Sequence, residues 1–208
     1  MLRRWYSQRL FPCLCDWALS TRTLHPYRQS CLSDVSGKVL EIGFGTGLNL
    51  EFYPSSVTEL HVVDVNPGMH KRAVDRIART PLPVHSHLLS GEFLPFPDQQ
   101  FDAVVSTFTL CSIPDVAQAL SEVTRVLRPS GRFCFLEHGL SPELSVANWQ
   151  HRLNSLQNLL GDGCHLNRAI PVLVREALLK LEPVPHEYLP HAPKFIGCLF
   201  RGTAFKPS

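Results

Sequence analysis

Three glycines within five residues follow an apolar run that carries a glutamate near its end. Residues 39–50 read VLEIGFGTGLNL, with Glu41 two positions before Gly43 and the other glycines at Gly45 and Gly47. Glycines make a tight turn in which the backbone itself can lie close to a ligand. A carboxylate at this place opposes a pyrophosphate and suits an amino group or another cation. The spacing therefore predicts a cradle for a small molecule that carries a positive charge.

A second acid, Asp64, lies near the end of the next apolar run, residues 59–65. An acid at the end of the second strand of an α/β sheet can accept hydrogen bonds from both hydroxyls of a ribose. Dinucleotide sites share that contact, but their G-x-G-x-x-G pattern needs a glycine where this chain has Leu48. An amino-acid part near Glu41 and a ribose near Asp64 together describe S-adenosylmethionine, which is the predicted cofactor. Taken alone, Glu41 is equally compatible with an acid that caps nearby backbone.

The elements that must position these residues alternate between strands and helices. Apolar runs predict strands at 38–42, 59–65, 83–89, 101–107 and 131–138, with helices expected at 48–53, 66–80 and 115–127. This alternation is typical of a parallel sheet with helices on both faces. Further helices are expected at 146–160 and 169–179, and segments 187–189 and 196–205 are too close together for a helix between them. We expect an α/β, Rossmann-like, doubly wound fold: a mostly parallel seven-stranded sheet with an antiparallel C-terminal hairpin and an N-terminal helical segment.

The length of 208 residues suits one domain. Within it we expect an N-terminal helical segment or lid (1–34), a cofactor-binding core (35–140), and acceptor-side helices with the C-terminal strands (141–208). Apolar residues recur at helical spacing near the start and are interrupted by Pro12, which predicts one or two short amphipathic helices bent there. A helix packed on the domain, a mobile lid and a membrane-surface helix all remain open for this segment.

Net charge and cysteine content indicate which class of partner and which cellular compartment to expect. The net charge of +2 comes from scattered lysines and arginines, so no basic stripe for nucleic acid is present. Seven cysteines without a C-x-x-C pair indicate a reducing compartment and no metal site. No apolar run reaches the ~18 residues of a membrane span. We expect a cytoplasmic protein with a small-molecule acceptor, without stable membrane insertion but with peripheral contact left open.

Four motifs together resemble those of class I S-adenosylmethionine-dependent methyltransferases. They are VLEIGFGTGLNL (39–50), VVDVNPGM (62–69), LPFPDQQFDAVVSTFTLCSIPD (94–115) and VTRVLRPSGRF (123–133). The later segments LEHG (136–139) and WQHRLNSLQNLLGDGCHLNR (149–168) are similar to a bacterial branch related to the mammalian methyltransferase-like 7 proteins, which are alkyl thiol S-methyltransferases. The resemblance implies that the chain is an enzyme and favours a thiol acceptor.

The resemblance also implies which residues hold the cofactor. The methionine part lies over the glycines with Glu41 beneath, the ribose lies on Asp64 and the adenine beside Val65. Many relatives have an acid or asparagine where this chain has Ser90, so Gly91 and Glu92 are expected to take over that contact. The full expected set is Glu41, Gly43, Gly45, Gly47, Asn49, Asp64, Val65, Ser90, Gly91, Glu92 and Thr107.

Methyl transfer from a sulfonium is an in-line displacement, so alignment and exclusion of water can supply much of the catalysis. Residues 107–113 and 137–139 are expected to wall the acceptor site. His138 is a candidate base, or a histidine satisfied by nearby backbone. Asp162 and His165, in the polar insert GDGCHLNR (161–168), line the site or cap helices.

Three other functions remain open. Within enzymes, a quinone or phospholipid acceptor is the main alternative to a thiol. A non-catalytic S-adenosylmethionine-binding module is the alternative from another class. A nicotinamide-dependent oxidoreductase is disfavoured by the glycine spacing and Glu41.

Overall fold

The computed structural model describes residues 2–207 and is built around one twisted sheet. Its strands follow the spatial order β3-β2-β1-β4-β5-β8. They are β1 (Gly37–Ile42), β2 (Val57–Asp64), β3 (Val84–Leu88), β4 (Phe101–Thr107), β5 (Leu127–His138) and β8 (Cys198–Phe205). The first five are parallel and β8 is antiparallel to β5. The short strands β6 (Lys180–Leu181) and β7 (His186–Tyr188) share the seventh position, both antiparallel to β8. The expected fold class is confirmed.

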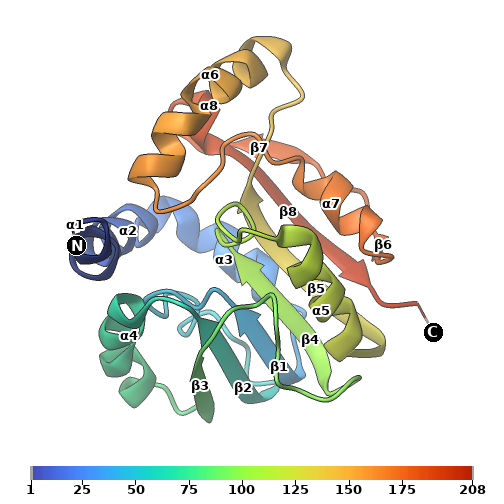
Figure 1. Ribbon diagram of the computed structural model, residues 1–208. Helices are drawn as coiled ribbons and strands as arrows, with labels where there is room; N and C mark the ends of the chain where they lie inside the picture. The colour runs from blue at the N-terminus through green and yellow to red at the C-terminus, as the bar shows by residue number, and fades with distance from the viewer. Residues whose placement is uncertain (1, 208) are drawn as a thin grey trace.

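Helices cover both faces of the sheet because successive strand residues point to opposite sides. Leu40 and Val104 belong to one core with α5 (Val116–Val126) and α7 (Ile170–Glu176). Their neighbours Val39 and Val105 belong to a second core, which includes residues of α3 (His25–Leu32) and α4 (Pro67–Arg79). Figure 1 shows α6 (Leu144–Leu160) and α8 (Lys194–Gly197) together at the top of the view. Helix α8 lies between β7 and β8, where no helix was expected; it fits there because it is a single turn of four residues.

Local signals set the start of the two central helices. Asn66 caps α4 by accepting a hydrogen bond from the backbone N–H of Gly68 at 2.9 Å, and Pro67 occupies the first turn. Asp115 caps α5 by accepting from the N–H of Gln118 at 3.0 Å. These caps explain why both helices begin within a residue or so of the expected place.

The prediction of a helix at residues 48–53 is wrong, since this segment consists of turns. Its backbone bonds join residues three apart, from Leu50 to Gly47 and from Phe52 to Asn49. The segment is too short to repay helix nucleation before Pro54. The Asn49 side chain is drawn instead into a buried polar network. Strand β5 also starts earlier than expected, at Leu127, because Leu127 already pairs with Phe101 of β4. The register shifts after this pair, and Ser130 has a left-handed φ of 61°.

The N-terminal segment contains α1 (Leu2–Trp5), a π-helical turn over Tyr6–Leu10 and α2 (Phe11–Leu19), followed by a short 3-10 turn, Arg22–Leu24. Pro12 has no N–H, so the carbonyl of Gln8 lacks its usual donor four residues later. Gly68 of α4 packs against that carbonyl, where an added Cβ would come within 2.1 Å of its oxygen. The π-helical turn, which is wider than a turn of α-helix, lies directly before α2, near the bend expected at Pro12. Figure 1 shows this segment between α4 and α6.

None of the helices in residues 2–207 combines the length and apolar character needed to cross a bilayer.

Candidate active site

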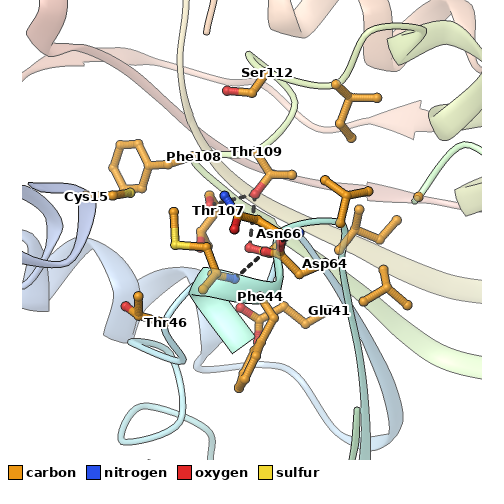
Figure 2. A pocket seen from close by; sticks show the side chains of 18 of the residues that line it. Cys15, Glu41, Phe44, Thr46, Asp64, Asn66, Thr107, Phe108, Thr109 and Ser112 are labelled. Atoms are coloured by element: carbon orange, nitrogen blue, oxygen red, sulfur yellow. Dashed lines mark hydrogen bonds between the residues drawn. The ribbon is translucent and has the colours of Figure 1, made fainter. Parts of the chain in front are cut away.

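A cavity opens at the carboxyl ends of β1, β2 and β4, where the crevice of a doubly wound sheet is expected. Its lining comes from the glycine turn (residues 43–47), the loop after β4, helix α2 and the insert (161–168). Figure 2 shows Asp64, Thr107 and Ser112 around one hollow, with Cys15 and Phe108 on the side of the N-terminal helix. Segments far apart in the sequence thus meet at one site.

The glycine turn adopts left-handed backbone at each glycine. The φ angles are 70° at Gly43, 58° at Gly45 and 82° at Gly47. A Cβ on Gly43 would overlap the side chain of Thr109, whose hydroxyl donates to the Gly43 carbonyl at 3.2 Å. The Cβ position of Gly45 is open, with one backbone oxygen at 3.9 Å as its nearest neighbour. Gly43 and Gly45 line the cavity, whereas Gly47 packs against Phe44 outside that lining.

Asp64 ties the glycine turn to the start of α4. One carboxylate oxygen, Oδ2, accepts from the N–H of Gly45 at 2.8 Å, and Oδ1 accepts from the N–H of Asn66 at 2.7 Å. Burial raises the pKa of Asp64, an effect opposed by these two backbone bonds. Each oxygen keeps a second lone pair, and the residue borders the cavity. Asp64 can therefore accept a pair of hydroxyls from a ligand.

Glu41 lies beneath the turn and is only 1% exposed. Its Oε1 accepts from the Asn49 side-chain amide and its Oε2 from the Tyr53 hydroxyl, each at 2.8 Å. Burial raises the pKa of Glu41 to about 7, although both hydrogen bonds and the charge of Arg28 act in the opposite direction. Glu41 thus borders the cavity beneath the glycine turn. It also belongs to a buried polar network with Asn49 and Tyr53.

Arg28 of α3 completes this network and was missed in the sequence. It is 3% exposed, and its Nη1 donates to Asn49 Oδ1 at 2.6 Å and to Thr107 Oγ1 at 3.3 Å. Within residues 2–207 no ion pair joins it to a carboxylate, and Glu41 is reached only through Asn49. Burial lowers the pKa of Arg28. A lone arginine in a polar helix is normally solvated, so its sequence context carried no signal.

The residues expected beside the adenine divide into two groups. Val65, Ser90 and Gly91 border the cavity. Glu92 lies behind them, where its carboxylate accepts from the Ser90 hydroxyl at 2.7 Å and from the backbone N–H of Asp115 at 2.7 Å. Glu92 therefore orients Ser90 and the start of α5, while the Ser90 hydroxyl is engaged by the carboxylate and the N–H of Glu92.

The N-terminal helical segment and the insert together cover the cavity. Phe11, Cys15 and Leu19 of α2 line it, as does Asp162 of the insert. The Ser7 hydroxyl donates to Asp162 Oδ2 at 2.5 Å, so the two covers meet. Further along the N-terminal segment, in α2, the Asp16 carboxylate accepts a hydrogen bond from the Thr46 hydroxyl at 2.5 Å.

Comparisons with known proteins bear on this arrangement. Residues 40–135 match the model of a methyltransferase domain. The chain is 34% identical to rat thiol S-methyltransferase TMT1B over 173 residues, which cover 76% of this chain and 68% of the relative. The chain belongs to the methyltransferase family. It is a class I S-adenosylmethionine-dependent methyltransferase, and S-adenosylmethionine is its cofactor.

Two further comparisons place the methyltransferase among its relatives. It is 32% identical over 127 residues to a phosphatidylethanolamine N-methyltransferase of Cereibacter sphaeroides, covering 60% of this chain and 62% of that one. A phosphoethanolamine N-methyltransferase of Haemonchus contortus, solved with S-adenosylhomocysteine, shares the fold with a TM-score of 0.71 at 14% identity. That superposition covers 93% of this chain and 56% of the other.

The cavity of the methyltransferase fits S-adenosylmethionine. Arg28 offers a buried cation that forms no ion pair with a carboxylate of residues 2–207, and this suits a carboxylate on a ligand. Asp64 keeps the lone pairs that ribose hydroxyls need, and Gly45 leaves its Cβ space open. These observations concern hydrogen-bonding capacity that Arg28 and Asp64 keep toward a ligand and the open space at Gly45, so they are independent of the family match.

The three candidate catalytic residues occupy different places. Asp162 borders the cavity, whereas His138 and His165 lie outside its lining. The Nε2 of His138 lies 3.0 Å from Cys164 Sγ, and the ring of His165 lies between the side chains of Asn154 and Asn158. A catalytic role for any of them stays a prediction.

Proposed function

We propose that this methyltransferase transfers a methyl group to the sulfur of a small alkyl thiol. The observation that carries the proposal is the identity of 34% to a thiol S-methyltransferase across three quarters of the chain. We further propose a reducing, cytoplasmic location, because all seven cysteines are free.

The walls of the cavity support a thiol acceptor. Phe11, Phe108 and Ile113 give apolar surface on the side of α2 and the loop after β4. Such a wall suits an alkyl chain and excludes water from the reacting groups. With His138 and His165 outside the lining, the site favours an acceptor that ionises by itself. An ordinary thiol has a pKa of about 8.5 and is partly ionised near neutral pH.

Different residues of the chain bind the cofactor and orient the acceptor in this proposal. When bound, S-adenosylmethionine supplies an electrophilic methyl group on a positively charged sulfur. We propose that Arg28 and Asn49 hold the carboxylate end of the cofactor, while Glu41 beneath the turn favours its ammonium group. Asp64 binds the ribose, and Val65 with Ser90 borders the adenine. Asp162, held by Ser7, orients the acceptor.

The proposal is tested by measuring kcat/KM for methyl transfer to an alkyl thiol, a phenol, a quinol and phosphatidylethanolamine. The expected result is turnover on the thiol with a kcat/KM well above that of the other three acceptors. Higher kcat/KM for any of the others would contradict the thiol assignment.

A lipid acceptor is the second candidate, and one feature of the N-terminal helices favours it. Trp17 is 78% exposed, and Leu2, Trp5 and Leu14 are also exposed, while α2 lines the cavity with other residues. An amphipathic helix of this kind can lie in a membrane surface and admit a lipid beneath it. Co-sedimentation with liposomes, combined with transfer to phosphatidylethanolamine in the same vesicles, would support this alternative. Neither result is expected if the acceptor is a small thiol.

A further inference from the structure

Three potential metal ligands from distant parts of the chain converge beside the cavity. Cys111 follows β4, His138 ends β5, and Cys164 lies in the insert between α6 and α7. Their ligand atoms, two Sγ and one ring nitrogen, all lie within 4.8 Å of one another. The Cys164 Sγ is 3.7 Å from the Cys111 Sγ and 3.0 Å from the His138 Nε2. Sequence spacing gave no hint of this group, because no two ligands are close in the chain.

The group is buried and its backbone is well held. All three side chains are buried. The backbone N–H of His165 donates to the Cys111 carbonyl at 2.9 Å, which fixes the insert against the loop after β4. The Asn158 amide donates to the Gly163 carbonyl at 3.0 Å on the other side of Cys164. A site on such rigid supports needs little rearrangement to bind an ion.

The separation of the two sulfur atoms matches that in a tetrahedral zinc site. With Zn–S bonds of about 2.3 Å, two thiolates of a tetrahedron lie roughly 3.8 Å apart. The observed Sγ to Sγ separation of 3.7 Å agrees with this value. The His138 Nε2 lies 3.0 Å from the Cys164 Sγ. With a Zn–N bond of about 2.05 Å the two atoms lie roughly 3.5 Å apart around zinc, so the imidazole needs to move outward by about half an ångström.

Charge also favours a divalent ion at this place. Two thiolates and one neutral imidazole around a divalent cation carry no net charge, which lowers the cost of burying them. The neighbouring acid cannot serve as a fourth ligand, because the Glu137 carboxylate accepts from Ser106, Thr109 and Leu110. Soft sulfur ligands with an imidazole select zinc over magnesium or calcium.

We propose that Cys111, His138 and Cys164 bind one zinc ion, with the fourth position left to a non-protein ligand. The ion joins the loop after β4, the end of β5 and the insert that carries Asp162. It thereby holds the acceptor side of the cavity together. The proposal does not depend on which acceptor the enzyme methylates.

The direct test is metal binding by the full-length, tag-free protein, without any activity measurement. Metal-free protein is titrated with Co²⁺ and its absorption is recorded. The expected result is one equivalent bound, with sulfur-to-cobalt charge-transfer and tetrahedral bands that zinc abolishes. The second group of potential ligands, Glu59, His61 and His85, contains no sulfur and gives no such charge transfer.

Variants assign the site to its residues. Cys164→Ser and Cys111→Ser are expected to lose the charge-transfer bands and the tight equivalent of zinc. Cys198→Ser removes a buried cysteine outside the group and is expected to keep both. Retention of the bands in Cys164→Ser would overturn the proposal.

A measurement on the wild-type protein covers the case in which the variants do not fold. Bound zinc is expected to protect Cys111 and Cys164 from alkylation, with release of both thiols by a chelator, as followed by peptide mass spectrometry. Equal alkylation with and without zinc would overturn the proposal. A disulfide between Cys111 and Cys164 in protein handled under zinc would overturn it as well.

Discussion

At the scale of single residues, the guanidinium of Arg28 reaches the carboxylate of Glu41 only through the amide of Asn49, by bonds of 2.6 Å and 2.8 Å. A buried charge in that position is best satisfied by an anionic ligand. Arg28→Gln is therefore expected to weaken binding of S-adenosylhomocysteine by about 10- to 100-fold, the loss of one charge-assisted contact. Calorimetric titration measures this change. Arg22→Gln, which alters an exposed arginine nearby, is the control, and an unchanged dissociation constant for Arg28→Gln would contradict the assignment.

The raised pKa of Glu41 makes a second prediction at this scale. Burial moves its pKa from 4.5 to about 7 in the folded protein. Between these values the folded state binds more protons than the unfolded state, so the free energy of unfolding falls as pH rises. Without ligand, the wild type is expected to lose on the order of 2–3 kcal/mol more than Glu41→Gln between pH 5 and pH 8. Urea unfolding at the two pH values measures the difference, and parallel losses in both proteins would contradict it.

At the scale of elements, the strands and the helices α4 and α5 were predictable from local signals. Their apolar runs are bounded by Asn66 with Pro67, by Asp115 and by glycine turns, so pattern and capping agree. The turns at 48–53 were not predictable, because the role of Asn49 depends on Glu41 and Arg28, which lie elsewhere in the sequence. The two-residue strand β6 is equally non-local, since it exists only through its pairing with β8.

Helix α2 is held beside the glycine turn by Asp16. Its carboxylate accepts a hydrogen bond from the Thr46 hydroxyl and forms an ion pair with Arg76. Both members of the ion pair are partly exposed, so the pair contributes modestly. Asp16→Asn is expected to raise the KM for S-adenosylmethionine about two- to fivefold with little change in kcat. Steady-state kinetics give both constants. Asp75→Asn, on an exposed position of α4, is the control, and a fall in kcat with unchanged KM would argue against a covering role.

At the scale of the whole molecule, the sheet places its acids and glycines at one edge, and the two covers meet over them. The order of motifs along the chain predicts that Asp64, Gly43 and Gly45 lie together at this edge, and all three line the cavity. Their contacts with the cofactor stay a prediction. The side of the cavity proposed for the acceptor depends on contacts such as Ser7 with Asp162 and His138 with Cys164. These join residues more than twenty positions apart, and sequence spacing alone contains no trace of them.

A competition for one methyl group distinguishes the proposed thiol acceptor from its alternatives. The purified protein is mixed with methyl-labelled S-adenosylmethionine and equal concentrations of an alkyl thiol, a phenol, a quinol and phosphatidylethanolamine. Asp64→Asn, which removes the charge proposed to bind the ribose, is run beside it. We expect label on the sulfur of the thiol in the wild type and a large loss of label in the variant. Label on another acceptor, or undiminished transfer by Asp64→Asn, would contradict it.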